Sequence, residues 1–184
     1  MAKQKVDINF IIEQSIKLFR QKTYHNTSMA DIASSCGILK GSLYHYFSSK
    51  EELMQKVIES IHLYFKEHIF SIAQNKELSP NERMKELCHA AEKVFFNQKT
   101  NKLYGNMGVE SAMVLEDFNP LLQDFFIDFF NALQTIFSSK YPEAQANELA
   151  ERSVAEIEGS IMLSRIFNNP NYIQNTFKRL IERV

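Results

Sequence analysis

Hydrophobic residues recur every three or four positions along most of the 184-residue chain. This spacing is the period of an α-helix, whereas a half-buried strand would alternate hydrophobic and polar residues. The sequence contains only five glycines and four prolines, which argues against the many turns of an all-β fold. We therefore expect an all-α protein of about nine helices, over residues 8–22, 29–36, 39–46, 50–73, 80–98, 103–115, 120–138, 143–167 and 170–184.

Signals for helix starts and stops mark out the first third of the chain. Ser28 is a good N-cap, and Asp31 three residues later can return a hydrogen bond as in a capping box. Gly37 supplies the left-handed backbone conformation that ends a helix and turns the chain. Ser49 and Glu52 predict a second capping box, from which a long helix departs. Two short helices joined by a tight turn and followed by a longer one are typical of a helix-turn-helix DNA reader.

Two other helix starts are marked in the same way. Asp7 can cap the first helix. Ser79 is followed by Pro80 at the first helical position and Glu82 at the third, which predicts another capping box.

The second short helix, over residues 39–46, separates its side chains into two sets. Leu43 and Phe47 are expected to face inward, which leaves the remaining residues outside as a groove-reading surface. Gly41 costs about 1 kcal/mol relative to alanine within a helix, so it suggests close approach by a neighbouring helix or a phosphate backbone. Tyr44 could instead be a core aromatic residue, but Lys40 one turn earlier favours contact with a phosphate or a base.

The residues from Ser28 to Leu53 follow the pattern S-x-x-x-I-A-x-x-x-G-I-x-x-G-S-L-Y-x-Y-F-x-x-K-E-x-L. This pattern resembles the signature of the TetR/AcrR family of bacterial transcriptional regulators. The resemblance implies an N-terminal three-helix DNA-binding domain over residues 1–50. It also implies a helical ligand-binding and dimerisation domain over residues 51–184, entered by the long connecting helix. A homodimer and repression relieved by a small molecule are the functional expectations.

The DNA contacts of that family carry over to positions at the start of the second helix, along the third and at the start of the fourth. Lys50 lies in a first helical turn, where free backbone amides and the positive end of the helix dipole favour a phosphate. Leu39 departs from the pattern, because many relatives have a short hydrophilic residue there. The expected DNA-binding residues are Thr27, Ser28, Leu39, Lys40, Gly41, Ser42, Tyr44, His45 and Lys50.

The charge distribution agrees with a DNA-binding N-terminus. The formal net charge of the chain is −1, but residues 1–50 contain seven Lys/Arg and three Asp/Glu, a net of +4. The other 134 residues contain 14 basic and 19 acidic side chains, a net of −5. A positive N-terminal part orients a protein toward a phosphate backbone.

The C-terminal part is rich in aromatic and methionine side chains, which suit a pliable pocket for a small apolar effector as well as an ordinary core. Two carboxylates among apolar residues could orient such a ligand. The expected ligand-binding residues are Tyr64, His68, Cys88, Phe95, Met107, Glu110, Met113, Phe126, Phe130 and Glu158.

The last two predicted helices carry apolar and small residues that permit close packing. In TetR-like proteins these two helices pair with their symmetry mates in a four-helix interface. The expected dimer-interface residues are Ser153, Gly159, Ser160, Ile166, Ile173, Phe177, Leu180 and Ile181.

Signs of other chemistry are weak. The cysteines, Cys36 and Cys88, fit a reducing cytosol, and their spacing from histidines does not match a structural zinc site. No apolar run reaches the roughly 18 residues that span a bilayer, and the N-terminus does not read as a signal peptide. We therefore expect a cytoplasmic protein with no membrane partner, no metal, no cofactor and no catalytic residues.

The leading hypothesis is a homodimeric repressor that binds a palindromic double-stranded DNA operator and is released by a small, largely apolar effector. One alternative is a helical small-molecule-binding protein whose DNA-binding part is vestigial. A second is an enzyme that uses the same cavity, with Cys88 and His89 as the nearest nucleophile and base.

Overall fold

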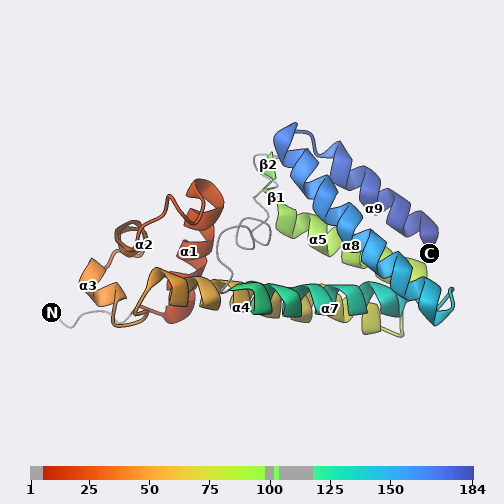
Figure 1. Ribbon diagram of the computed structural model, residues 1–184, viewed down its shortest axis with the longest axis horizontal. Coiled ribbons are helices and arrows are strands. Elements are labelled where there is room, and N and C mark those ends of the chain that lie inside the picture. Colours follow the sequence, from red (N-terminus) through yellow and green to blue (C-terminus); the bar gives the residue numbers. More distant parts are fainter. Residues whose placement is uncertain (1–5, 98–101, 104–117) are drawn as a thin grey trace. The chain divides into compact units, whose positions relative to one another are not determined.

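A computed structural model describes residues 6–97, 102–103 and 118–184 (Figure 1). These residues are helical apart from one short antiparallel pair of strands, so the all-α prediction is confirmed. The elements are α1 (Ile8–Lys22), α2 (Met29–Ser35), α3 (Lys40–Leu43), α4 (Lys50–His68), a 3₁₀ helix (Phe70–Gln74), α5 (Pro80–Phe95), β1 (Phe96–Asn97), β2 (Lys102–Leu103), α7 (Asn119–Phe137), α8 (Glu143–Ile166) and α9 (Asn171–Arg183).

The predicted helix starts are present with their capping hydrogen bonds. The Asp7 carboxylate accepts from the Asn9 amide at 3.1 Å, which caps α1. Ser28 and Asp31 form the predicted capping box at α2, and Ser79 with Glu82 forms another at α5. Each cap satisfies backbone amides that have no partner within the helix, so polar side chains close in sequence set these boundaries.

The α4 cap differs from the prediction in one half. The Glu52 amide donates to Ser49 Oγ at 3.0 Å, as expected. The Glu52 carboxylate, however, accepts from the amide and hydroxyl of Ser48, both at 2.6 Å, rather than from Ser49. The carboxylate therefore stabilises the turn that precedes α4 as well as the helix start.

Several helix boundaries differ from the prediction, and α5 ends at Phe95 rather than at residue 98. The helix expected over residues 39–46 ends at Leu43, because the His45 and Tyr46 amides bond three residues back, to the Ser42 and Leu43 carbonyls, and Phe47 is buried in the core. The long helix expected to reach Ala73 ends at His68 and continues as the 3₁₀ helix, while Leu103 lies in β2 rather than at a helix start. The rest of the helix expected over residues 103–115 lies outside the described residues.

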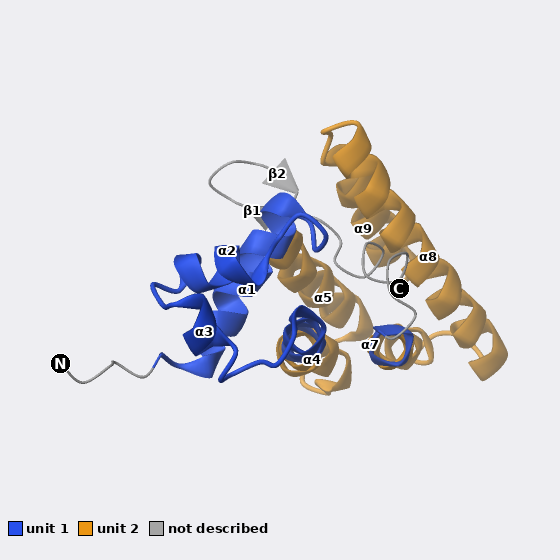
Figure 2. Cartoon of the chain, turned by 60° about the vertical axis from the view of Figure 1, so that its left-hand side comes forward, with its two compact units in different colours: residues 1–62, 107–122 blue, residues 63–106, 123–184 orange. Residues whose placement is uncertain are grey.

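The chain divides into two compact units, coloured separately in Figure 2. Unit 1 comprises residues 1–62 and 107–122, and its core is a single hydrophobic cluster of buried side chains. Unit 1 therefore extends through His62 and includes the start of α7, while the functional boundary at residue 50 stays a prediction. Its fully buried members include Ile11, Ile32, Leu43, Phe47, Leu53, Met54, Val57 and Phe118.

Unit 2 comprises residues 63–106 and 123–184. Its described part contains α5, most of α7, and the neighbouring helices α8 and α9 (Figure 1). Small buried residues of α8, including Ala146, Ala150 and Ser153, let α9 approach closely. Glu156 joins the two helices further, because its carboxylate accepts from Arg179 Nε at 2.6 Å.

Aromatic side chains form a second feature of unit 2. Phe65, Phe70, Phe125 and Phe129 lie with ring centroids between 5.2 and 6.3 Å apart. These separations lie within the range of favourable edge-to-face and stacked contacts. The phenylalanines of α7 therefore pack against the end of α4 and the 3₁₀ helix that follows it.

Candidate nucleic-acid interface

The surface around α3 carries the side chains that the sequence predicted to face outward. Leu43 and Phe47 are 0% and 2% exposed, whereas Leu39 is 71% and Tyr44 44% exposed. Lys40, Gly41 and His45 are also exposed, and Ser42 is half-buried. The inward and outward sets were therefore predicted correctly, although the helix is shorter than expected.

The turn before α3 fixes which residues point outward. Gly37 has a φ of +66°, a conformation that suits glycine. The Ile38 amide then donates to the Ala33 carbonyl at 3.0 Å, which closes the end of α2. This turn starts α3 at Lys40, so that Leu43 enters the core beside α2.

The most exposed part of α3 combines a cation with an aromatic ring. Lys40 Nζ lies 5.9 Å from the centroid of the Tyr44 ring, one helical turn later. A cation at this distance is attracted to the ring face, which holds both side chains on one side of the helix. This arrangement offers an ammonium group to a phosphate and a phenol to a base edge or a phosphate.

The start of α2 lies beside α3 in the same unit and carries two more predicted contacts. Thr27 is 1% exposed, and its hydroxyl donates to the Thr23 carbonyl at 2.7 Å. Ser28 is exposed, and its amide donates to the Asp31 carboxylate at 2.9 Å. Thr27 therefore supports the loop from within, whereas Ser28 reaches the surface.

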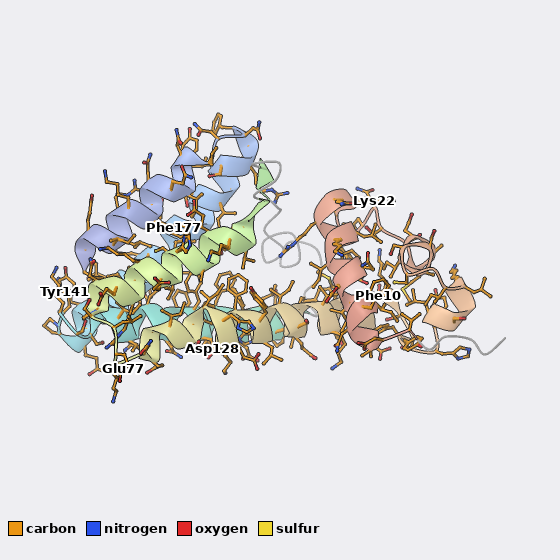
Figure 3. All side chains as sticks on the ribbon, turned by 180° about the vertical axis from the view of Figure 1, so that it is seen from behind. Phe10, Lys22, Glu77, Asp128, Tyr141 and Phe177 are labelled. Carbon is orange, nitrogen blue, oxygen red and sulfur yellow. The ribbon has the colours of Figure 1, made fainter. Side chains whose placement is uncertain are left out.

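Asp31 places a negative charge next to this surface. Hydrogen bonds from Ser28, followed by one from Lys22, lower the pKa of Asp31 to about 2. Lys22 Nζ lies 3.2 Å from the carboxylate and offsets its charge; Figure 3 labels Lys22 on α1. The carboxylate thus remains ionised to cap α2 while the adjacent cation limits its repulsion of an anion.

Lys50 is held by the loop between α1 and α2. Its ammonium group donates to the Tyr24 and Thr27 carbonyls, each at 3.1 Å, and lies 4.2 Å from the centroid of the Tyr24 ring. The Tyr24 hydroxyl in turn donates to Glu51 Oε1 at 3.2 Å. Burial raises the pKa of Tyr24, as does the negative charge of Glu51, so the hydroxyl remains a donor.

Tyr24, Glu51 and Phe118 were missed by the sequence analysis. Tyr24 lies between two helices, where hydrophobic periodicity gives no signal. Phe118 directly precedes α7, distant in sequence, and contacts Tyr24 edge-to-face with ring centroids 6.2 Å apart. The position of Tyr24, an aromatic residue shortly before a polar helix start, could have indicated its role. No feature of the neighbouring sequence indicated the role of Phe118.

The predicted ligand-binding residues fall into three groups. Phe95 and Phe126 adjoin the aromatic cluster through Phe65 and Phe125, with ring centroids 6.1 and 5.4 Å apart. Tyr64 is 47% exposed and lies against His68, with ring centroids 4.7 Å apart. Phe130 and Glu158 are half-buried, Cys88 is buried, and Met107, Glu110 and Met113 lie outside the described residues.

Cys88 also lines a groove of about 530 Å³ between α5 and α9. Phe177 and Ile181 form part of the opposite wall, and Lys85 and His89 lie along the α5 side. Burial raises the pKa of the Cys88 thiol to about 12, so it is a neutral thiol near pH 7. This protonation state is the opposite of what a cysteine nucleophile requires.

Most of the predicted dimer-interface side chains are covered within the subunit. Ser153, Ser160, Ile173, Phe177 and Leu180 are between 0 and 7% exposed, mainly because α8 and α9 pack on each other. Gly159 and Ile181 are partly exposed and Ile166 is 66% exposed. A second subunit could directly contact Gly159, Ile166 and Ile181, which reach the surface. The buried residues would support an interface only indirectly, by holding α8 against α9.

The described residues lack two further features. They contain no group of three or more His, Cys, Asp or Glu side chains placed to bind a metal ion. None of their helices has both the length and the apolar character needed to cross a bilayer.

Comparisons with known proteins agree with this geometry. Residues 11–57 match the family described as "Bacterial regulatory proteins, tetR family". An uncharacterized HTH-type transcriptional regulator in the lacX 3′ region of Lactococcus lactis subsp. lactis is 26% identical over 178 residues, which cover 92% of this chain and 89% of that protein. The biofilm operon icaADBC HTH-type negative transcriptional regulator IcaR of Staphylococcus epidermidis is 42% identical over 55 residues, 30% of each chain. A crystal structure of a TetR transcriptional regulator from Legionella pneumophila has the same fold, with a TM-score of 0.86 over 100% of both chains at 20% identity.

The state of the two cysteines can be tested by thiol modification. Cys36 and Cys88 are both free and buried, and burial raises the pKa of each thiol. At pH 8 we expect Cys88 in the folded protein to react with a disulfide reagent on the order of 10³-fold more slowly than an unfolded cysteine. The Cys36→Ser variant isolates Cys88, and the same variant in denaturant is the control. Rapid reaction of the folded variant would show that the Cys88 thiol is accessible or ionised, which would contradict its burial and raised pKa.

Proposed function

Because this chain belongs to the tetR family of bacterial regulatory proteins and is a transcriptional regulator, we propose that it is a homodimeric repressor of a palindromic operator, released by a small, largely apolar effector. The observation that carries the proposal is the set of exposed side chains on and next to α3. Leu43 and Phe47 of the same segment are buried and fix its orientation. IcaR, which is similar to this chain over 55 residues, is by name a negative regulator, which supports repression.

Base reading is assigned to α3 and phosphate binding to its surroundings. Leu39, Tyr44 and His45 are exposed and would meet base edges and thymine methyl groups in the major groove. Lys40, Ser28 and Lys50 would bind phosphates on either side and set the position of the helix. The net charge of +4 over residues 1–50 supports this division.

The absence of a side chain at Gly41 has no packing explanation within the subunit. Apart from the two adjacent residues and the backbone of its own helix, no described atom lies within 4 Å of where a Cβ would stand, and the backbone φ is not in the left-handed region. The space would instead accommodate a DNA backbone passing close to α3. We therefore assign Gly41 to the DNA contact rather than to the fold.

Dimerisation is assigned to an exposed apolar stripe on α8. Gly159, Met162 and Ile166 follow one another at helical spacing, and Met162 and Ile166 are 49% and 66% exposed. Phe167, 60% exposed, extends the stripe at the end of the helix. Such a stripe can pair with its own copy across a twofold axis, which would present two α3 helices to half-sites about 34 to 36 Å apart or a multiple of that distance.

The effector is assigned to unit 2, where α7 supplies a wall of phenylalanines. Phe126 and Phe130 are only half-buried, so apolar area remains for a ligand. The neutral Cys88 supports binding rather than catalysis, in keeping with relatives that are transcriptional regulators. A repressor of chromosomal DNA acts in the bacterial cytoplasm, which we propose as its location.

The reading surface can be tested with Lys40→Ala and Tyr44→Ala. The probe is the duplex that the wild-type protein selects from random DNA, and the measurement is its dissociation constant by fluorescence anisotropy. We expect each variant to bind about 10-fold or more weakly, because each removes an exposed contact at little cost to folding. Lys178→Ala, an exposed lysine of α9, is the matched control and should bind normally. Unchanged affinity in both α3 variants would refute the assignment.

Gly41→Ala separates stability from DNA binding. Alanine favours a helix over glycine by up to about 1 kcal/mol, so the free energy of unfolding should stay the same or rise. The added methyl group should nevertheless weaken operator binding by about 10-fold if a DNA backbone lies against it. Urea unfolding and anisotropy measure the two effects, and normal DNA affinity would show that Gly41 is not at the contact.

Ile166→Glu tests the α8 stripe. A charged side chain in an apolar interface leaves an ion without a partner, so the dimer should dissociate to monomers at micromolar concentration. Sedimentation velocity measures the change, and operator affinity should fall with it. Asn175→Glu, on the exposed polar side of α9, is the control and should remain dimeric. A stable Ile166→Glu dimer would place the interface elsewhere.

A further inference from the structure

The start of α7 belongs to the core of the DNA-binding unit. Phe118 is 1% exposed and Leu122 is 7% exposed, and both lie in the same hydrophobic cluster as Tyr24, Phe47 and Leu53. This placement is informative, because α7 then continues without interruption to Phe137 in unit 2. Phe118 thus has a position from which it can influence residues of the DNA contact.

Tyr24 connects Phe118 to α4. The edge-to-face contact with Phe118 and a tilted contact with Phe19, with centroids 5.5 Å apart, enclose the Tyr24 ring. The hydroxyl is held by Glu51 at 3.2 Å. With two aromatic contacts and its hydroxyl bonded to Glu51, the Tyr24 ring has little freedom to move while Phe118 stays in place.

Lys50 depends on that ring and on the loop that carries it. Its ammonium group lies 4.2 Å from the ring centroid and donates to the Tyr24 and Thr27 carbonyls. An ammonium group has three N–H donors, so these two bonds leave one for a phosphate. The carbonyl of Thr27 directly precedes Ser28, the N-cap of α2, so the same cation also fixes where α2 begins.

We propose that Phe118 is a positioning residue for DNA binding, acting through Tyr24 to hold Lys50 in place for a phosphate. The proposal rests on the DNA-binding function proposed above. It assigns to the start of α7 a role in operator affinity, although Phe118 itself does not touch DNA. Removing the Phe118 ring frees the Tyr24 ring, and Lys50 then loses the fixed geometry that lets it meet a phosphate.

The test is a double-mutant cycle between Phe118 and Lys50, with the full chain and the duplex selected by the wild-type protein. We expect Phe118→Ala to weaken binding by about 10-fold, and Lys50→Ala to weaken it by a similar or larger factor. The double variant should bind like Lys50→Ala alone, because Phe118 acts through Lys50. Multiplication of the two single effects would overturn the proposal.

The salt dependence gives a readout that general destabilisation does not produce. Each lost phosphate contact reduces the slope of log K against log salt concentration by about 0.9. Phe118→Ala and Lys50→Ala should each show this reduction, and the double variant should show it once. Phe137→Ala, which removes an equally buried ring from unit 2, is the control and should keep the wild-type slope. An unchanged slope for Phe118→Ala would overturn the proposal.

Two further comparisons decide the remaining outcomes. If urea unfolding shows that Phe118→Ala does not fold, Phe118→Leu keeps most of the apolar volume but loses the aromatic edge, and the same cycle applies with about a threefold effect. If Lys50→Ala binds with wild-type affinity and slope, the proposal fails while DNA binding itself stands. If the wild-type protein selects no sequence from random DNA, the proposed function fails first.

Discussion

The burial of Leu43 and Phe47 is the constraint on which the proposed DNA contact depends. α3 has four residues, too few for its own hydrogen bonds to keep it folded in water. Its orientation therefore comes from the core of unit 1, where these side chains pack with residues of α2 and α4. Because Leu43 and Phe47 pack in one position in this core, the exposed side chains of the same segment are fixed in direction.

Polar groups add a second level of definition to the same surface. Asp31 caps α2, and Lys22 offsets its negative charge. The Lys50 ammonium group donates to two loop carbonyls, which hold it in one position. Both cases use an ion to satisfy backbone groups. The surface proposed for DNA is thus ordered before DNA arrives, which lowers the entropic cost of binding.

Features that depend on neighbours in sequence were predictable. The caps at Asp7, Ser28 and Ser79 follow from short-range hydrogen bonds, and the inward direction of Leu43 follows from helical period. The early end of α3 was not predictable, since it reflects the path that Phe47 takes into the core.

Contacts between distant segments account for the rest. The last two helices were expected to form the subunit interface, and this stays a prediction, because the period of a helix does not say which partner covers its apolar side. In the structure Ile173 and Leu180 are buried within the subunit, whereas the exposed stripe lies on α8. The Phe118–Tyr24 contact joins residues far apart in the sequence and left no local pattern.

Both α4 and α7 begin in unit 1 and continue into unit 2. One helix was expected to enter the C-terminal domain, whereas two helices of the structure contribute residues to both units. Because Phe118 and Leu122 complete the core of unit 1, the first 62 residues alone would lack part of that core.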